Sequence, residues 1–147
     1  MWTKNVLLFF NSHTPGYNGG KPQTYSRQEA ASVPDSMDWR LFGAVTPVKD
    51  QSICGSCWSF GTVGHLEGTR FLQTNDLVEL SQQALVDCSW GFGNNGCDGG
   101  EDTRVYQWML ANDGIPSEDS YGPYLGQDGY CHVKDTKPAF QVCWLLI

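Results

Sequence analysis

Apolar side chains recur at helical spacing in the middle of the chain. Between Cys57 and about Gln73 they follow one another at intervals of three and four residues, which predicts a helix. The positions on this stripe are Phe60, Val63, Leu66, Glu67, Phe71 and Leu72, of which only Glu67 is polar. Three glycines in the same stretch each weaken an isolated helix by about 1 kcal/mol relative to alanine, so we expect them to mark close packing.

Two shorter helices are predicted further along. The stretch "LSQQALVDC" is typical of a short helix capped by Ser81. After a loop rich in glycine at residues 89–102, Asp102 is a candidate cap for a helix through "TRVYQWMLAND" that Gly114 would stop. The predicted inner face of this last helix consists of Val105, Trp108 and Met109.

Composition and charge exclude several classes of protein. The chain has 147 residues, of which 40% are hydrophobic, enough for one domain with a core. A net charge of −7 and the lack of a Lys/Arg cluster argue against binding to nucleic acid. No apolar run approaches the roughly 20 residues of a membrane span, so we expect no membrane anchor. Residues 1–10 resemble a secretory signal only weakly, and residues 11–32 have the composition of a linker.

The six cysteines carry the candidate chemistry. An even number in a short acidic chain suggests an oxidising compartment, although six cysteines allow 15 full pairings. The segment "DQSICGSCWSFG" contains Cys54 and Cys57, a pair used by redox dithiols, by zinc sites and by thiol nucleophiles that have a structural neighbour. The first four cysteines do not have the spacing of a zinc site, and we expect no metal. The turn before Cys54 differs from the apolar strand that precedes a redox dithiol.

A nucleophilic thiol fits the segment best. If Cys57 opens the predicted helix, its sulfur lies among unsatisfied backbone N–H groups at the positive end of the helix dipole. Both effects favour the thiolate, which is the reactive form. Gln51, six residues upstream on a turn, can then offer its amide N–H to an oxyanion together with the backbone N–H of Cys57.

The residues around Cys57 carry a family resemblance. The segment "PVKDQSICGSCWSF" resembles the active-site signature of the papain-like cysteine proteases, in the cathepsin-L-like branch. The match continues, in family order and at family spacing from about residue 33 to residue 134, through "DWR", "LSQQALVDC", "GCDGG" and "YGPYLGQDGYC". The resemblance implies the α+β papain-like fold, with a helical left domain and a β-rich right domain. We expect this chain to contribute mainly the disulfide-stapled left domain, at residues 33–135. Residues 1–32 would be a disordered linker or proregion remnant, and residues 136–147 an apolar tail in which the resemblance fades.

The same resemblance assigns roles to individual residues. It makes Cys57 the nucleophile, Gln51 the side chain of the oxyanion hole, and Gly99 and Gly100 the backbone edge that binds a peptide, with Trp58 beside it. It implies the disulfides Cys54–Cys97 and Cys88–Cys131, leaving Cys143 unpaired. It further implies polypeptide substrates, protein inhibitors as possible partners, no cofactor, and a lysosomal or extracellular location.

A proton acceptor for Cys57 is missing from the expected site. His65 lies eight residues along the predicted helix, or about 12 Å at 1.5 Å per residue, whereas hydrogen-bond reach is about 3 Å. His13 and His132 are expected at the surface. In the family, the catalytic His and Asn come from the right domain. Two hypotheses follow: this is a fragment of a cysteine endopeptidase that is inactive alone, or a non-catalytic half-protease that binds peptides or inhibitors.

Overall fold

The computed structural model describes residues 2–3 and 26–141. The chain divides into two compact units, residues 1–43 (together with residue 147) and residues 44–146, and each is described by itself. The predictions for His13 and Cys143 lie outside the described residues. Within the described residues, no helix is both long and apolar enough to cross a membrane.

The first unit contains short elements. They are β1 (Trp2–Thr3), α2 (Arg27–Ser32), β2 (Ser36–Met37) and the 3-10 helix η1 (Trp39–Phe42), and β1 pairs antiparallel with β2. The helix α2 falls within the stretch that its composition assigned to a linker. It begins with a capping box, in which the Ser26 hydroxyl accepts from the N–H of Glu29 and the Glu29 carboxylate accepts from the N–H of Ser26. The Ser-x-x-Glu pattern was the missed signal.

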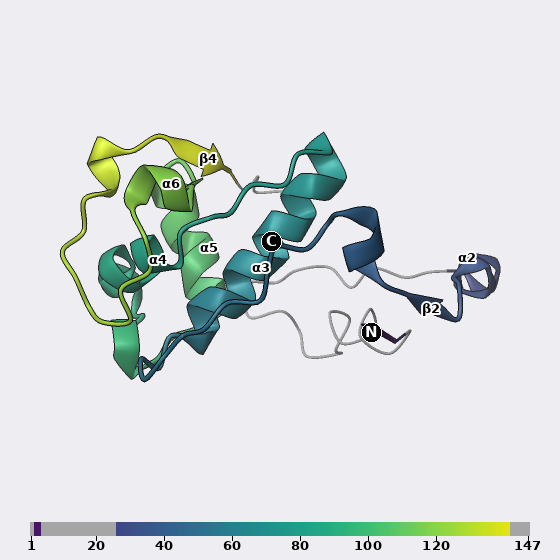
Figure 1. Ribbon diagram of the computed structural model, residues 1–147, viewed down its shortest axis with the longest axis horizontal. Coiled ribbons are helices and arrows are strands. Elements are labelled where there is room, and N and C mark those ends of the chain that lie inside the picture. Colours follow the sequence, from purple (N-terminus) through teal and green to yellow (C-terminus); the bar gives the residue numbers. More distant parts are fainter. Residues whose placement is uncertain (1, 4–25, 142–147) are drawn as a thin grey trace. The chain divides into compact units, whose positions relative to one another are not determined.

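The second unit is built on α3 (Cys57–Thr74), the long teal helix of Figure 1. The helices α4 (Gln82–Cys88) and α5 (Asp102–Ala111) contact α3, and α6 (Glu118–Tyr121) contacts α4. Three 3-10 helices and two strands complete the unit: η2 (Trp90–Phe92), η3 (Gly96–Asp98), η4 (Val133–Asp135), β3 (Ile115–Pro116) and β4 (Pro138–Phe140).

The predicted helices form close to their expected bounds, with small differences. Ser81 caps α4 by accepting from the N–H of Ala84 at 3.0 Å. The cap of α5 is Glu101 instead of Asp102, which is the first helical residue. The inner face of α5 is buried as predicted. Leu72, placed on the apolar stripe of α3, is 62% exposed, because the stripe drifts towards solvent in the last turn.

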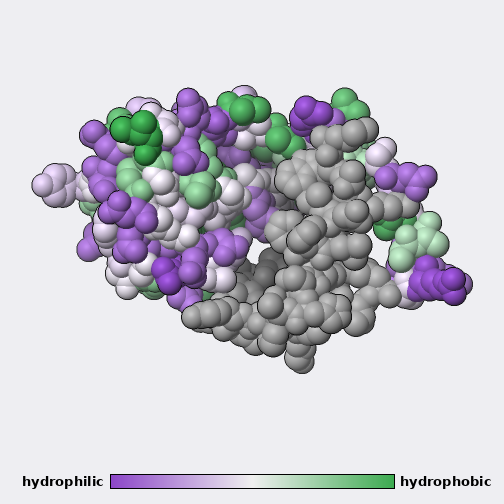
Figure 2. Space-filling view, turned by 90° about the horizontal axis from the view of Figure 1, so that it is seen from below, coloured by the Kyte–Doolittle hydropathy of each residue, from purple (hydrophilic) through white to green (hydrophobic). Residues whose placement is uncertain are grey.

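The core lies between α3, α4 and α5. It is a cluster of buried apolar side chains from these helices and the adjoining segments: Trp58, Val63, Leu66, Leu80, Leu85, Val86, Val105, Trp108, Met109 and Ile115. Glu67 is buried beside it, where its carboxylate accepts hydrogen bonds from the N–H of Leu80 at 2.9 Å and the hydroxyl of Thr46 at 2.6 Å. Burial raises the pKa of Glu67. On the coloured part of the face drawn in Figure 2, hydrophobic residues form small groups among hydrophilic ones.

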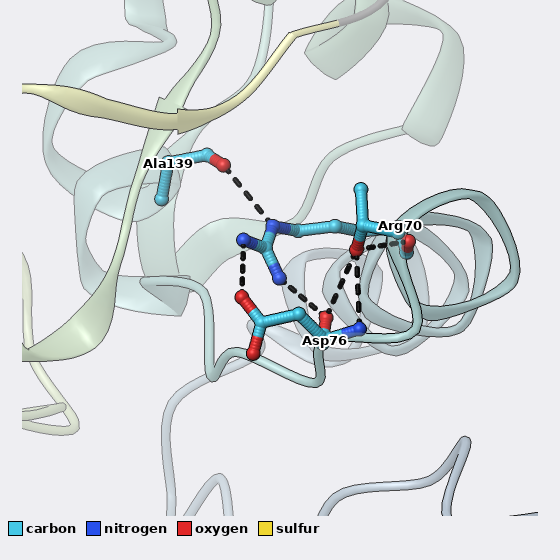
Figure 3. A network of polar contacts seen from close by, with 4 residues as sticks. Arg70, Asp76 and Ala139 are labelled. Carbon is cyan, nitrogen blue, oxygen red and sulfur yellow. Dashed lines mark hydrogen bonds and ion pairs between the residues drawn. The ribbon is translucent and has the colours of Figure 1, made fainter.

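The described part of the apolar tail forms a strand, β4. Strand β4 pairs antiparallel with β3, with Ile115 opposite Phe140. Arg70 of α3 fixes this strand, since its Nε donates to the carbonyl oxygen of Ala139 at 3.3 Å (Figure 3). The same guanidinium binds Asp76, donating to its carbonyl oxygen and pairing with its carboxylate at 2.8 Å. Strand β3 and the long side chain of Arg70 therefore hold the described part of the tail in place.

Candidate active site

Cys57 is the first residue of α3, and its thiol is free and exposed. The N-cap residue is Ser56, whose carbonyl oxygen accepts from the N–H groups of Ser59 at 2.8 Å and Phe60 at 3.3 Å. Among the described residues, the N–H groups of Cys57 and Trp58 have no hydrogen-bond partner. The sulfur therefore lies at a helix end where the first two backbone N–H groups have no partner among the described residues. Such an end stabilises negative charge.

Gln51 lies on the turn that leads into this helix. The turn is closed by Asp50, whose carboxylate accepts from the N–H of Ser52 at 2.8 Å. Gln51 folds back so that its Nε2 donates to the carbonyl oxygen of Cys54 at 2.9 Å. A primary amide has two N–H donors, so this contact fixes the side chain and leaves the second donor available.

A disulfide joins the turn to the glycine-rich loop. The structure contains Cys54–Cys97, with Cα atoms 4.6 Å apart, and Cys88–Cys131, with Cα atoms 4.9 Å apart. Next to the first disulfide, the N–H of Gly55 donates to the carbonyl oxygen of Cys97 at 2.8 Å. All the described cysteines except Cys57 are therefore in disulfides.

Gly99 and Gly100 form a half-buried edge of this loop. Gly99 has φ 116°, a backbone angle that residues with a side chain rarely adopt. Its carbonyl oxygen accepts from the N–H of Asn95 at 2.8 Å. Neither the N–H nor the carbonyl of Gly100 has a hydrogen-bond partner within the described part of the chain. One N–H and one C=O on the same residue are what an added strand pairs with.

Trp58 lies under this edge. Its side chain is 8% exposed, and its indole N–H donates to the carbonyl oxygen of Gly96 at 3.1 Å. A Cβ at Gly100 would come within 2.7 Å of the indole ring. Trp58 therefore supports the glycine loop from the core side.

Sequence reasoning missed three side chains that hold the site. Asn94, buried in the loop, accepts from the N–H of Glu101 at 2.9 Å, and Asp128 accepts from the N–H of Cys97 at 2.7 Å. Tyr124 has its hydroxyl 2.6 Å from the Ser56 hydroxyl and donates to the Gln51 carbonyl oxygen at 3.0 Å. These contacts link residues up to 73 positions apart, so no local pattern signals them.

Neither described histidine is placed to accept a proton from the Cys57 thiol. His65 is on α3, about 12 Å along the axis from the first residue of the helix. Both ring nitrogens of His132 contact carbonyl oxygens elsewhere, those of Tyr121 at 2.8 Å and Tyr130 at 3.1 Å. Residues 2–3 and 26–141 therefore contain a free thiol at a helix start but place no imidazole within hydrogen-bond reach of it. The same residues contain no cluster of three or more His, Cys, Asp or Glu side chains arranged to hold a metal ion.

Comparison with known proteins decides the family. The sequence profile of the papain family cysteine proteases matches residues 33–143. The chain belongs to this family. The match extends beyond residue 135, so the family pattern includes β4.

Individual relatives agree with this assignment. The chain is 52% identical to a cathepsin L-like peptidase of Aedes aegypti over 114 residues, which cover 78% of this chain and 33% of the relative. It is 50% identical to cathepsin S of Bos taurus over 144 residues, covering 97% of this chain and 43% of the relative. A recombinant stem bromelain precursor has a similar structure, with a TM-score of 0.74 and 31% identity over 82% of this chain and 38% of that one.

The chain matches only part of the length of each of these relatives. It spans about a third to two fifths of the length of these relatives. Its described residues have the papain-like fold, as the helix-rich part stapled by two disulfides, with little sheet.

Proposed function

We propose that the chain supplies the nucleophile-bearing half of a cysteine-type endopeptidase, with its left domain at residues 33–135. The observation that carries the proposal is the state of Cys57. It is a free, exposed thiol at the start of an 18-residue helix, while Cys54, three positions earlier, is held in a disulfide. That arrangement separates a reactive sulfur from a structural one.

In the proposed reaction, the Cys57 thiolate attacks the carbonyl carbon of a peptide bond and a C–S bond forms. The carbonyl oxygen becomes an oxyanion, which the backbone N–H of Cys57 and the second Nε2–H of Gln51 stabilise. The C–N bond then breaks, and the leaving amine takes the proton that an imidazole removed from the thiol. Water hydrolyses the resulting thioester to release the acid.

The substrate is proposed to be a polypeptide in extended conformation. Its backbone pairs with the free N–H and C=O of Gly100, as a strand adds to a sheet edge. Gly99 gives the loop the backbone conformation that this edge needs, and Trp58 fixes the edge from below. Protein inhibitors that present an extended segment would use the same contacts. The two disulfides suit a lysosomal or extracellular location.

A second candidate is a half-protease that binds peptides or inhibitors without cleaving them. The observation in its favour is that the described residues bring no imidazole to Cys57. We expect this chain by itself to show essentially no turnover of peptide substrates.

Covalent labelling tests the first proposal. The folded chain is treated with a peptidyl chloromethyl ketone, or with chloroacetamide as the control without a peptide, and the labelled cysteine is found by mass mapping. We expect both reagents to label Cys57, the peptidyl reagent faster, and neither to label Cys57→Ser. Mapping of Cys57 into a disulfide with Cys54 would overturn the assignment in favour of a redox role. Peptide hydrolysis that Cys57→Ser abolishes would refute the expectation of inactivity.

A further inference from the structure

The serine before the catalytic helix does not cap it. Serine at the N-cap position ordinarily accepts a hydrogen bond from the N–H of the second or third helical residue. Three other helices of this chain follow the rule: Ser26, Ser81 and Ser117 cap α2, α4 and α6 through contacts of 3.2, 3.0 and 3.3 Å. Ser56 at the start of α3 makes no such contact, although it is fully buried.

The Ser56 hydroxyl is bound elsewhere, by Tyr124. The two hydroxyl oxygens are 2.6 Å apart, and Tyr124 donates its only hydrogen to the Gln51 carbonyl oxygen at 3.0 Å. Because a phenol has one O–H, Ser56 must be the donor to Tyr124. The chain of hydrogen bonds therefore runs from Ser56 through Tyr124 to Gln51.

Two features hold Tyr124 in place. Its ring meets that of Phe60, one turn into α3, edge to face, with centroids 4.9 Å apart and an interplanar angle of 83°. Its hydroxyl has both a donor and an acceptor among the described residues. The tyrosine is thus anchored on α3 itself and on the turn that carries Gln51.

The consequence appears at the helix end. With Ser56 turned away, the N–H of Trp58, the second helical residue and one that a serine cap can bind, has no side-chain partner in the described part of the chain. The N–H of Cys57 beside it has none either. A capping hydroxyl would place its oxygen lone pairs where the thiolate or an oxyanion needs donors. We propose that Tyr124 is a positioning residue of the Cys57 site: it withdraws the Ser56 hydroxyl from the start of α3 and holds the Gln51 turn beside it. This rests on the proposed function only in taking Cys57 as the nucleophile.

The pH dependence of Cys57 alkylation by iodoacetamide, measured on the folded full chain, tests this role. Tyr124→Phe keeps the ring against Phe60 and removes the hydroxyl, so that Ser56 is released to cap α3. We expect the alkylation midpoint to move to higher pH, and the rate below the midpoint to fall about two- to fivefold, the size of one interaction with the helix end. Adding Ser56→Ala to Tyr124→Phe removes the competing cap and should return the midpoint towards that of the wild type.

Two further variants make the test decisive. Tyr121→Phe also removes a tyrosine hydroxyl with a hydrogen bond, here to Asp87 at 2.9 Å, and is expected to leave the midpoint unchanged. Ser56→Ala alone stays informative if Tyr124→Phe does not fold. Because the hydroxyl already points away, its loss should not lower the midpoint, and a lowered midpoint would mean that Ser56 caps α3 in solution.

The proposal is overturned if Tyr124→Phe folds and keeps the wild-type midpoint, or if the double variant does not recover. Failure of the proposed function looks different, because Cys57 would then be found in a disulfide or would not react with the peptidyl reagent.

Discussion

The N–H of Gly55 donates to the carbonyl oxygen of Cys97 at 2.8 Å, beside the disulfide that joins Cys54 to Cys97. A Cβ at Gly55 would lie 2.4 Å from that same oxygen, which is backbone and cannot swing aside. The turn that carries Cys54 and Gly55 and the glycine loop therefore approach each other as closely as two backbones can, and only glycine permits this.

Gly55→Ala is expected to lower the free energy of unfolding by about 1–3 kcal/mol, the usual effect of an added methylene where there is no room. Urea unfolding measures it. Gly61→Ala is the matched control, because Gly61 is an exposed interior residue of α3 with no atom within 4 Å of its Cβ position. Alanine there should raise stability by about 0.5–1 kcal/mol. Equal effects of the two substitutions would contradict the close approach.

Ser52 has a left-handed backbone, with φ 56°, immediately after Gln51. Such a conformation costs a residue other than glycine about 1–2 kcal/mol. Glycine avoids this cost, but it loses more conformational entropy on folding, which offsets part of the gain. Ser52→Gly should therefore raise the free energy of unfolding by up to about 1 kcal/mol, as measured by thermal or urea unfolding. A loss of stability would show that the side chain of Ser52 contributes more than its backbone strain removes.

The disulfide Cys88–Cys131 closes a loop with a sequence separation of 43. Replacing both cysteines with alanine should lower the free energy of unfolding by about 4 kcal/mol, because the unfolded chain gains conformational entropy. Cys57→Ala is the control, since an exposed free thiol should change stability by no more than about 0.5 kcal/mol. Similar effects of the two changes would argue that the disulfide adds little to the folded state.

His132 is expected to make the folded chain more stable at low pH than at high pH. Hydrogen bonds to the carbonyl oxygens of Tyr121 and then Tyr130 raise the pKa of His132, and the charges of Asp87 and Asp135 act in the same direction. Both nitrogens can donate to carbonyls only in the imidazolium form. The ring is also stacked on that of Tyr121, with centroids 3.9 Å apart.

The contribution of His132 to stability decreases as the pH rises. A pKa raised in the folded state contributes stability that is fully present below about 6.5, the unfolded value, and is lost as pH rises through the folded value. The free energy of unfolding of the wild type should therefore decline between pH 5 and pH 8.5. The decline should be shallower in His132→Gln. NMR titration of the His132 ring should place its midpoint above 6.5. Parallel pH profiles for the two proteins would rule out the contribution.

Three helices of the second unit could be predicted from the sequence because their signals are local. The stripe of α3, the Ser81 cap of α4 and the buried face of α5 all lie within a few turns. Motif spacing identified the family, which the profile match over residues 33–143 confirms. Prediction failed where partners are distant: composition did not reveal that Arg70 would bind the strand containing Ala139, 69 positions away.

By itself, the sequence determined which residue types stand next to one another: a cysteine at a helix start, glycines at a loop edge, and a glutamine on the preceding turn. Their local geometry follows from backbone preferences and helix periodicity, which neighbouring residues set. Only the tertiary structure decided that the Ser56 hydroxyl turns to Tyr124 and away from its own helix. A cap and a distant phenol compete for the same hydroxyl, and the packing of Tyr124 against Phe60, which decides between them, exists only in the folded chain.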